Sequence, residues 1–171
     1  LIKVADDRSL ELTDEGRRRA TEVIRKHRLA ERLLLDVIGL DRRLVHEEAC
    51  RWEHVMSEQV EGRLASILDD VSTDPFGNPV PPQTAEHPRP SADEVSVERL
   101  ASRETTTAVV SRIGEPIQAD AELIAALEDA AIAAGAQVEL RVSAGGVRLV
   151  GASGDPVVLS DDVARHLFVR R

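Results

Sequence analysis

The chain has 171 residues, of which 42 % are hydrophobic and only 2 % aromatic, so it fits one domain or two small ones with a core built from aliphatic side chains. Its formal net charge of −9 argues against a nucleic-acid binder that works through overall basicity. One cysteine excludes an internal disulfide and suits a reducing cytoplasm, where we expect the protein to be, and no apolar run approaches the ~20 residues that span a bilayer.

A β-hairpin is expected at the start of the chain. The segments LIKVA and SLELT carry strand-like apolar residues, and residues 6–8 between them are polar turn formers. Because the chain starts with Leu1 inside this pattern, we expect an N-terminus from which a preceding segment is missing.

Three helices are expected next. Thr13 followed by two acids indicates the start of a long amphipathic helix, and Gly39 indicates its end near residue 38. A second helix is expected at residues 43–56. Ser57 would cap a third helix, which would bury three apolar side chains, those of Val60, Leu64 and Ile67.

The composition changes at residue 74. Residues 74–104 open with DPFGNPVPPQTAEHPRPSADE, which we interpret as a proline-rich linker that buries no core. Beyond it, TTTAVVSRI, VELRV, GVRLVG and PVVLS indicate short strands, interrupted by the helical pattern DAELIAALEDA. Gly-Gly and Ser-Gly-Asp turns separate the later strands, so residues 105–171 predict a small β-barrel.

The most informative motif is HEEACRWEHVM, residues 46–56. In a helix of about 3.6 residues per turn, four of its side chains share one face: His46, Cys50, Glu53 and His54. Imidazole, thiolate and carboxylate groups all bind divalent metal ions. The stripe therefore predicts metal binding.

His27 and Glu31 form a second such face, one turn apart on the first helix, and facing helices of this kind build the metal sites of bundles. At about 1.5 Å per residue, His46 lies roughly 9 Å along its helix from the Cys50, Glu53 and His54 group, which predicts two sites. The mixed ligands favour Fe(II), Mn(II), Co(II), Ni(II) or Zn(II) over Ca(II) or Mg(II). Ordinary polar residues on solvated helix faces are the alternative.

These motifs resemble those of the diphtheria toxin repressor family, the iron-dependent repressors of Gram-positive bacteria. HEEACRWEHVMS, RKHRLAERLL and DPFGNPVP carry the resemblance, which is dense up to about Pro81. It implies a homodimer with a winged helix-turn-helix domain, a helical metal-binding and dimerisation domain, and an SH3-like β-barrel, which is an α+β fold. Here it implies a remnant wing at residues 1–13, the helical domain at 14–73, the linker at 74–104 and the barrel at 105–171.

The resemblance also divides the ligands. It implies an ancillary site of five residues, His27, Glu31, His46, Glu115 and Gln118, the last two standing in the motif GEPIQ. It implies a primary, activating site of Cys50, Glu53 and His54, which agrees with the spacing argument. No catalytic residues are implied, so an enzyme is not expected; the alternative is a non-haem iron enzyme that uses two histidines and one carboxylate.

Two departures from the family pattern matter, together with one feature that the family implies for the linker. The family adds a methionine from near the N-terminus to the primary site, whereas the one methionine here is Met56. The family holds an anion partly through the residues that match Arg28 and Asn78, and Asp74 stands where a serine is usual, so it should repel or replace that anion. Finally, the proline-rich stretch would either dock on the barrel or act as a plain tether.

We therefore interpret the chain as most of an Fe(II)-activated repressor of iron-homeostasis genes without its recognition helix. Mn(II), Co(II), Ni(II) and Zn(II) are possible substitutes for Fe(II). The expected partners are a second copy and, in the full-length protein, operator DNA, but no membrane. Two alternatives remain: a manganese-responsive repressor of the same superfamily, which Cys50 argues against, and a truncated regulator that inactivates a complete paralogue.

Overall fold

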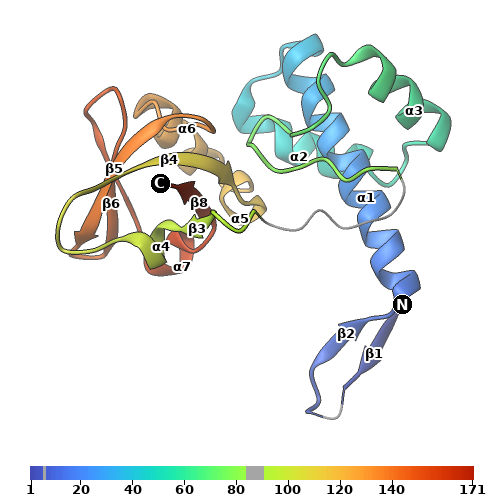
Figure 1. Ribbon diagram of the computed structural model, residues 1–171. Coiled ribbons are helices and arrows are strands. Elements are labelled where there is room, and N and C mark those ends of the chain that lie inside the picture. Colours follow the sequence, from blue (N-terminus) through green and yellow to red (C-terminus); the bar gives the residue numbers. More distant parts are fainter. Residues whose placement is uncertain (6, 84–90) are drawn as a thin grey trace.

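The computed structural model describes residues 1–5, 7–83 and 91–171. A hairpin at the N-terminus leads into a helical domain, and the chain ends in a domain built on a six-stranded antiparallel sheet (Figure 1). The expected α+β architecture is confirmed. No described helix is both long and apolar enough to cross a bilayer.

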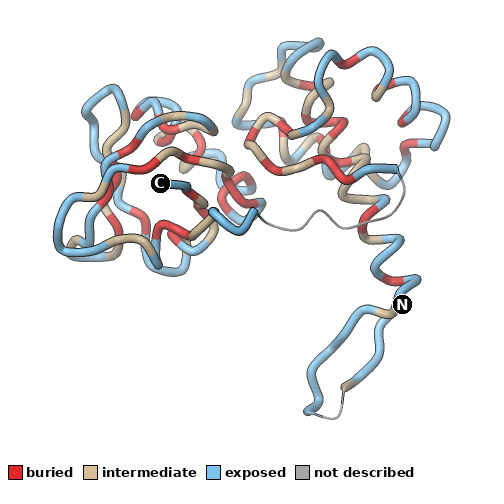
Figure 2. Tube along the Cα trace, in the orientation of Figure 1, coloured by how far each residue is buried: buried red, intermediate tan, exposed pale blue. Residues whose placement is uncertain are grey.

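The predicted hairpin is confirmed. Strands β1 (Ile2–Val4) and β2 (Leu10–Leu12) pair antiparallel, while residue 6 of its turn lies outside the described residues. Every residue of both strands is exposed, and the hairpin projects away from the helical domain (Figure 2). The amide of Thr13 donates to the carbonyl of Leu1 at 2.8 Å, which ties the hairpin to the first helix.

The helical domain starts with α1 (Asp14–Arg32), where the Thr13 side chain accepts a hydrogen bond from the Gly16 amide. The helix continues as a π-helical segment, η1 (Leu33–Ile38), and ends at Gly39, whose φ of 74° is the left-handed conformation expected of a glycine cap. The second helix, α2 (Arg42–Trp52), ends four residues earlier than expected, so Glu53 and His54 lie in the turn that follows it.

Helix α3 (Glu58–Ile67) begins at the predicted Ser57 cap but buries a different face from the one expected. Leu64 is buried, whereas Val60 and Ile67 are half exposed. The reason is an ion pair: Nε of Arg25 on α1 lies 2.7 Å from Oε1 of Glu61, and both side chains are nearly buried. This pair turns Glu61 and Leu64 toward α1, which leaves Val60 outside.

The expectation that residues 74–104 bury no core is wrong for both described parts of this segment, because Val97, like Phe76, is completely buried. Phe76 is completely buried, and it belongs to one cluster of apolar side chains that extends from the helices into the sheet domain. The carbonyl of Phe76 accepts the Ile113 amide at 2.8 Å, and the Asn78 side chain donates to the Ile113 carbonyl at 2.9 Å. Residues 74–79 therefore join the two domains. Residues 84–90, which include much of the proline-rich stretch, lie outside the described residues.

The C-terminal sheet has the order β3-β8-β4-β5-β6-β7. The four expected strands appear as β4 (Thr106–Ile113), β5 (Gln137–Ser143), β6 (Gly146–Val150) and β7 (Pro156–Leu159), and the expected helix as α6 (Ala121–Asp129). Elements that the sequence did not predict are β3 (Val95–Ser96), α4 (Val97–Leu100), α5 (Glu115–Gln118), α7 (Asp161–Ala164) and β8 (Leu167–Arg170). Helix α5, directly after β4, faces the helical domain.

Candidate metal centre

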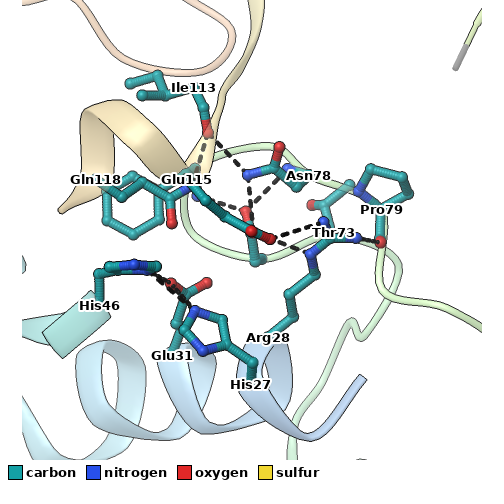
Figure 3. A network of polar contacts seen from close by, with 12 residues as sticks. His27, Arg28, Glu31, His46, Thr73, Asn78, Pro79, Ile113, Glu115 and Gln118 are labelled. Carbon is teal, nitrogen blue, oxygen red and sulfur yellow. Dashed lines mark hydrogen bonds and ion pairs between the residues drawn. The ribbon is translucent and has the colours of Figure 1, made fainter. Parts of the chain in front are cut away.

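Three predicted ligands converge between α1 and α2 (Figure 3). Nε2 of His27 lies 2.8 Å from Oε1 of Glu31 and 3.1 Å from Nδ1 of His46, and that Nδ1 lies 3.3 Å from the same Glu31 oxygen. Glu31 is completely buried and His27 nearly so. We call these three residues the inner group. Helical spacing explains the first contact, and the packing of α1 on α2 supplies the other two.

The other three residues of the HEEACRWEHVM motif form an outer group, Cys50, Glu53 and His54. Sγ of Cys50 lies 3.7 Å from Nε2 of His46, and Oε2 of Glu53 lies 2.7 Å from Nδ1 of His27. His54 contacts Glu53 at 3.0 Å, but its side chain is 69 % exposed. The structure thus brings both groups into one continuous cluster, in which the ligand atoms of His27, His46 and Cys50 lie within 4.8 Å of one another. The division into two sites remains a prediction.

The sheet domain places its two candidate ligands on the opposite side of the inner group. Figure 3 shows the Gln118 side chain on the side of His46, whereas Glu115 extends from α5 toward Arg28. Gln118 is buried, and its Nε2 donates to the Ile113 carbonyl at 2.6 Å. Glu115 is half exposed and contacts Nη2 of Arg28 at 3.4 Å.

Two buried oxygens support a cation at this place. Oε2 of Glu31 and Oε1 of Gln118 have no hydrogen-bond partner within the described part of the chain. A buried polar atom without a partner costs roughly 1–3 kcal/mol. A divalent cation bound among these oxygens and the imidazoles would satisfy both, so the residues present fit the metal that the sequence predicted.

The charges of the inner group are strongly coupled. Burial lowers the pKa of His27, but hydrogen bonds and the negative charges of Glu31 and Glu53 outweigh it and raise the pKa above its ordinary value. Burial raises the pKa of Glu31, but the two histidines outweigh it and lower the pKa. Burial and the nearby carboxylates raise the pKa of the Cys50 thiol, so a metal ion would have to displace its proton.

Comparison with known proteins identifies the family to which this chain belongs. Residues 13–82 match the family model for the iron-dependent repressor metal-binding and dimerisation domain, and residues 95–171 match that for the diphtheria toxin repressor SH3 domain. The iron-dependent repressor IdeR of Mycobacterium tuberculosis strain H37Rv is 45 % identical over 177 residues, which cover all of this chain and 77 % of that protein. The chain belongs to the iron-dependent repressor family.

Other members agree with this assignment. The diphtheria toxin repressor of Corynebacterium glutamicum is 46 % identical over 175 residues, covering 100 % of this chain and 76 % of that protein. A solved structure described as a manganese-dependent transcriptional repressor in complex with manganese superposes with a TM-score of 0.81 at 27 % identity, covering 99 % of this chain and 77 % of that one. These relatives are named as transcriptional repressors rather than as enzymes.

Asp74, which stands where the family usually has a serine, is held by hydrogen bonds within the segment that joins the two domains. The Asp74 carboxylate is buried and accepts hydrogen bonds from the Phe76 amide, the Asn78 amide and the Asn78 side chain, each at 2.8–2.9 Å. Its Oδ2 lies 3.7 Å from Nε of Arg28. This Nε atom has no hydrogen-bond partner among the described residues. The Asp74 carboxyl group thus faces Arg28. That Asp74 repels or replaces the anion which the family pattern implied there remains a prediction.

Sequence reasoning missed two features of this repressor's centre. It did not link Glu53 to His27, because the two residues belong to different helices and no short spacing reveals the contact. It also missed Arg42, which donates to the Pro75 carbonyl at 2.9 Å, lies 3.2 Å from Glu128 and stacks on the Phe76 ring. The conspicuous signal was Phe76, a rare aromatic residue inside a stretch interpreted as a linker.

Proposed function

We propose that this chain serves in a homodimeric, Fe(II)-activated transcriptional repressor that controls iron-homeostasis genes. The observation that carries the proposal is the convergence of His27, Glu31 and His46 at a buried point. Two buried oxygens there, one of them from Gln118 of the other domain, have no hydrogen-bond partner among the described residues. A metal bound there would hold the two domains together, so that its binding energy would favour one arrangement of the molecule. The names of the relatives support iron as the metal.

Metal titration tests the core of this proposal. Anaerobic addition of Fe(II) to the metal-free chain should give saturable binding and raise the midpoint of thermal unfolding, because a ligand that binds only the folded state stabilises it. Co(II) serves as the air-stable probe. Absence of any saturable binding of Fe(II) or Co(II) would contradict the proposal.

We place the dimer contact on a surface formed by the end of α2 and by α3. A shallow apolar groove of about 230 Å³ lies there, lined by Leu33, Trp52, Val55, Met56, Ser57, Val60 and Leu64. Val55, Val60 and Ile67 expose large apolar side chains on the same helices. Exposed apolar surface of this kind marks a protein interface, and the matching family model is described as a dimerisation domain.

The dimer contact can be tested with two matched substitutions. Val60 is 50 % exposed and Val158, on β7 of the sheet domain, is 51 % exposed. Val60→Asp should convert the chain to a monomer in sedimentation equilibrium, because a charge would be buried in the contact, while Val158→Asp should leave the dimer unchanged. If both variants dimerise equally well, the dimer contact does not lie on this surface.

We also propose that these 171 residues alone do not bind operator DNA. The support is electrostatic: the net charge is −9, and Arg17, Arg18 and Arg19 at the start of α1 are paired with Asp14, Glu15 and Glu22. An arginine that already pairs with a carboxylate gains less from contact with a DNA phosphate than an unpaired one does. A metal-dependent gel shift of iron-uptake promoter fragments by this chain would contradict the proposal.

A manganese-responsive repressor is the second candidate, favoured by the manganese complex among the similar structures. Cys50 favours the iron-activated repressor over the manganese-responsive one, because a thiolate is a softer ligand than the oxygen donors that suit manganese. DNA binding by the full-length protein should respond to Fe(II) at lower free concentrations than to Mn(II). Activation by Mn(II) without a response to Fe(II) would reverse the choice.

A further inference from the structure

Each imidazole of the inner group uses both of its ring nitrogens. His27 directs Nε2 to Glu31 at 2.8 Å and Nδ1 to Glu53 at 2.7 Å. His46 directs Nδ1 to Glu31 at 3.3 Å and Nε2 to Cys50 at 3.7 Å. The two rings therefore stand between the inner and outer groups, and each ring touches a member of both.

The contact between His27 and Glu53 is the shortest of the links between the two groups, since Sγ of Cys50 lies 4.0 Å from the same Nδ1 of His27. The Glu53 amide donates to the Ala49 carbonyl at 3.0 Å, so the residue continues the last turn of α2 and its side chain is mostly buried. One carboxylate oxygen, Oε2, faces His27, and the other, Oε1, faces His54 at 3.0 Å. Glu53 thus has one oxygen for each side of the cluster.

A carboxylate in this position decides which nitrogen of a histidine is free to bind a metal. An imidazole that binds a metal through one nitrogen keeps its proton on the other, and a hydrogen-bond acceptor there fixes both the tautomer and the ring orientation. His27 must use Nε2 to share a metal with Glu31 and His46, because Nε2 is the nitrogen that faces them. The proton then belongs on Nδ1, where Glu53 accepts it.

We propose that Glu53 is a positioning residue for the inner group as well as a candidate ligand in the outer group: it accepts the Nδ1–H of His27 and so holds Nε2 ready for the metal. The inference rests on the proposed metal-sensing function. Glu53 then serves both groups, so a change at this residue alters metal binding on both sides. Loss of an acceptor behind a metal-bound histidine typically weakens metal binding by about 10- to 100-fold.

Zn(II) titration of the full chain, in competition with a chromophoric chelator, tests this with two single substitutions. His54→Ala removes an outer-group side chain that contacts Glu53 rather than His27. It should therefore weaken only Zn(II) binding at the outer group (the outer step), and change the tighter Zn(II) binding at the inner group (the inner step) by no more than about twofold. Glu53→Ala should weaken both steps, the inner one by about 10- to 100-fold. Glu53→Gln keeps an oxygen that can accept the Nδ1–H, so it should restore most of the inner step but not the outer one.

A second readout reports on the His27 ring itself. In the Zn(II)-loaded chain, nitrogen-15 NMR should show His27 protonated on Nδ1, with a proton that exchanges slowly with water because Glu53 holds it. In Glu53→Ala that exchange should become fast, while His54→Ala should leave it slow. Circular dichroism establishes that each variant is folded.

The possible outcomes separate this inference from the proposed function. If Glu53→Ala behaves like His54→Ala in both readouts, Glu53 acts only in the outer group and the inference is wrong, although the chain still binds metal. If the unsubstituted chain binds no Zn(II), Co(II) or Fe(II), the inference and the proposed function fail together.

Discussion

The inner and outer groups contain the same kinds of ligand in very different surroundings. Glu31 is completely buried and is held by His27 and His46 from two packed helices. Cys50 is exposed, and the His54 side chain is 69 % exposed in the turn after α2. Packing therefore holds the inner group in place, whereas the outer group is attached to it most closely through Glu53.

This difference sets the expected behaviour of the two groups. The side chains of the inner group are held by packing, so little ordering entropy opposes metal binding there. The metal would also bind the oxygens of Glu31 and Gln118, which have no hydrogen-bond partner among the described residues. A metal in the outer group must order exposed side chains and remove a proton from a thiol whose pKa is raised. We expect tight binding at the inner group and weaker, more pH-dependent binding at the outer one.

The largest effect is expected from His27→Ala. The substitution removes a ligand of the inner group together with the link to Glu53, so the tight step should weaken by more than about 100-fold. Glu47→Ala on α2 is the matched control, because Glu47 is exposed and pairs with Arg51. Calorimetric titration with Co(II) measures both variants; an unchanged tight step in His27→Ala would contradict the assignment of the inner group.

A smaller effect is expected from the sheet domain. Gln118→Ala deletes the buried Oε1 that faces the inner group and should weaken the tight step by about tenfold. Glu115→Ala, on the same short helix but half exposed, should have the smaller effect of the two. If Glu115→Ala has the larger effect in the same titration, the exposed carboxylate rather than the buried amide is the ligand from this domain.

The third prediction concerns pH and the segment that joins the domains. Burial and the negative charge of Glu31 raise the pKa of Asp74 from 3.8 to about 7, against the opposing hydrogen bonds of Asn78 and the charge of Arg28. The folded state therefore keeps this proton up to about pH 7, while the unfolded state loses it near 3.8. Because the unfolded state binds fewer protons in this window, the free energy of unfolding should fall as pH rises through it, by an amount on the order of 4 kcal/mol.

Urea denaturation of the metal-free chain at pH 4 to 8 measures this slope. His27, whose pKa is also raised, contributes stability below the unfolded pKa of about 6.5 that is lost as pH rises through its folded pKa, so wild type alone cannot separate the two residues. The variant Asp74→Asn separates them. Its free energy of unfolding should decline less between pH 4 and pH 7 than that of wild type. Parallel curves for the two proteins would show that Asp74 is ionised in the folded state throughout.

The sequence predicted the parts of this protein that depend on local rules. Helix caps at Thr13, Gly39 and Ser57, the four strands with regular alternation and the histidine–carboxylate spacing of α1 follow from neighbouring residues alone. Six of the eight candidate ligands could be read in the same way, from spacings of three or four residues on α1 and in the motif HEEACRWEHVM. Glu115 and Gln118 were implied only by the family resemblance.

The parts that sequence reasoning missed depend on contacts between distant segments. Residues 74–79 looked like a tether because they are polar and proline-rich, yet Phe76 fills the space between the domains and Asn78 bonds to Ile113. Helix α3 turned outward at Val60 because Arg25, 36 residues before Glu61, draws Glu61 inward. The Glu53 link to His27 spans 26 residues and arises only when α2 packs on α1.

One measurement tests the account most directly: calorimetric titration of the metal-free chain with Co(II), compared between wild type and Cys50→Ala. The Cys50 sulfur contacts the inner group at 3.7 Å from Nε2 of His46 and at 4.0 Å from Nδ1 of His27. The account predicts two binding steps in wild type, and in Cys50→Ala the loss of the weaker step with the tighter step retained. A single step in wild type, or the loss of both steps in Cys50→Ala, would show that one shared site replaces the inner and outer groups.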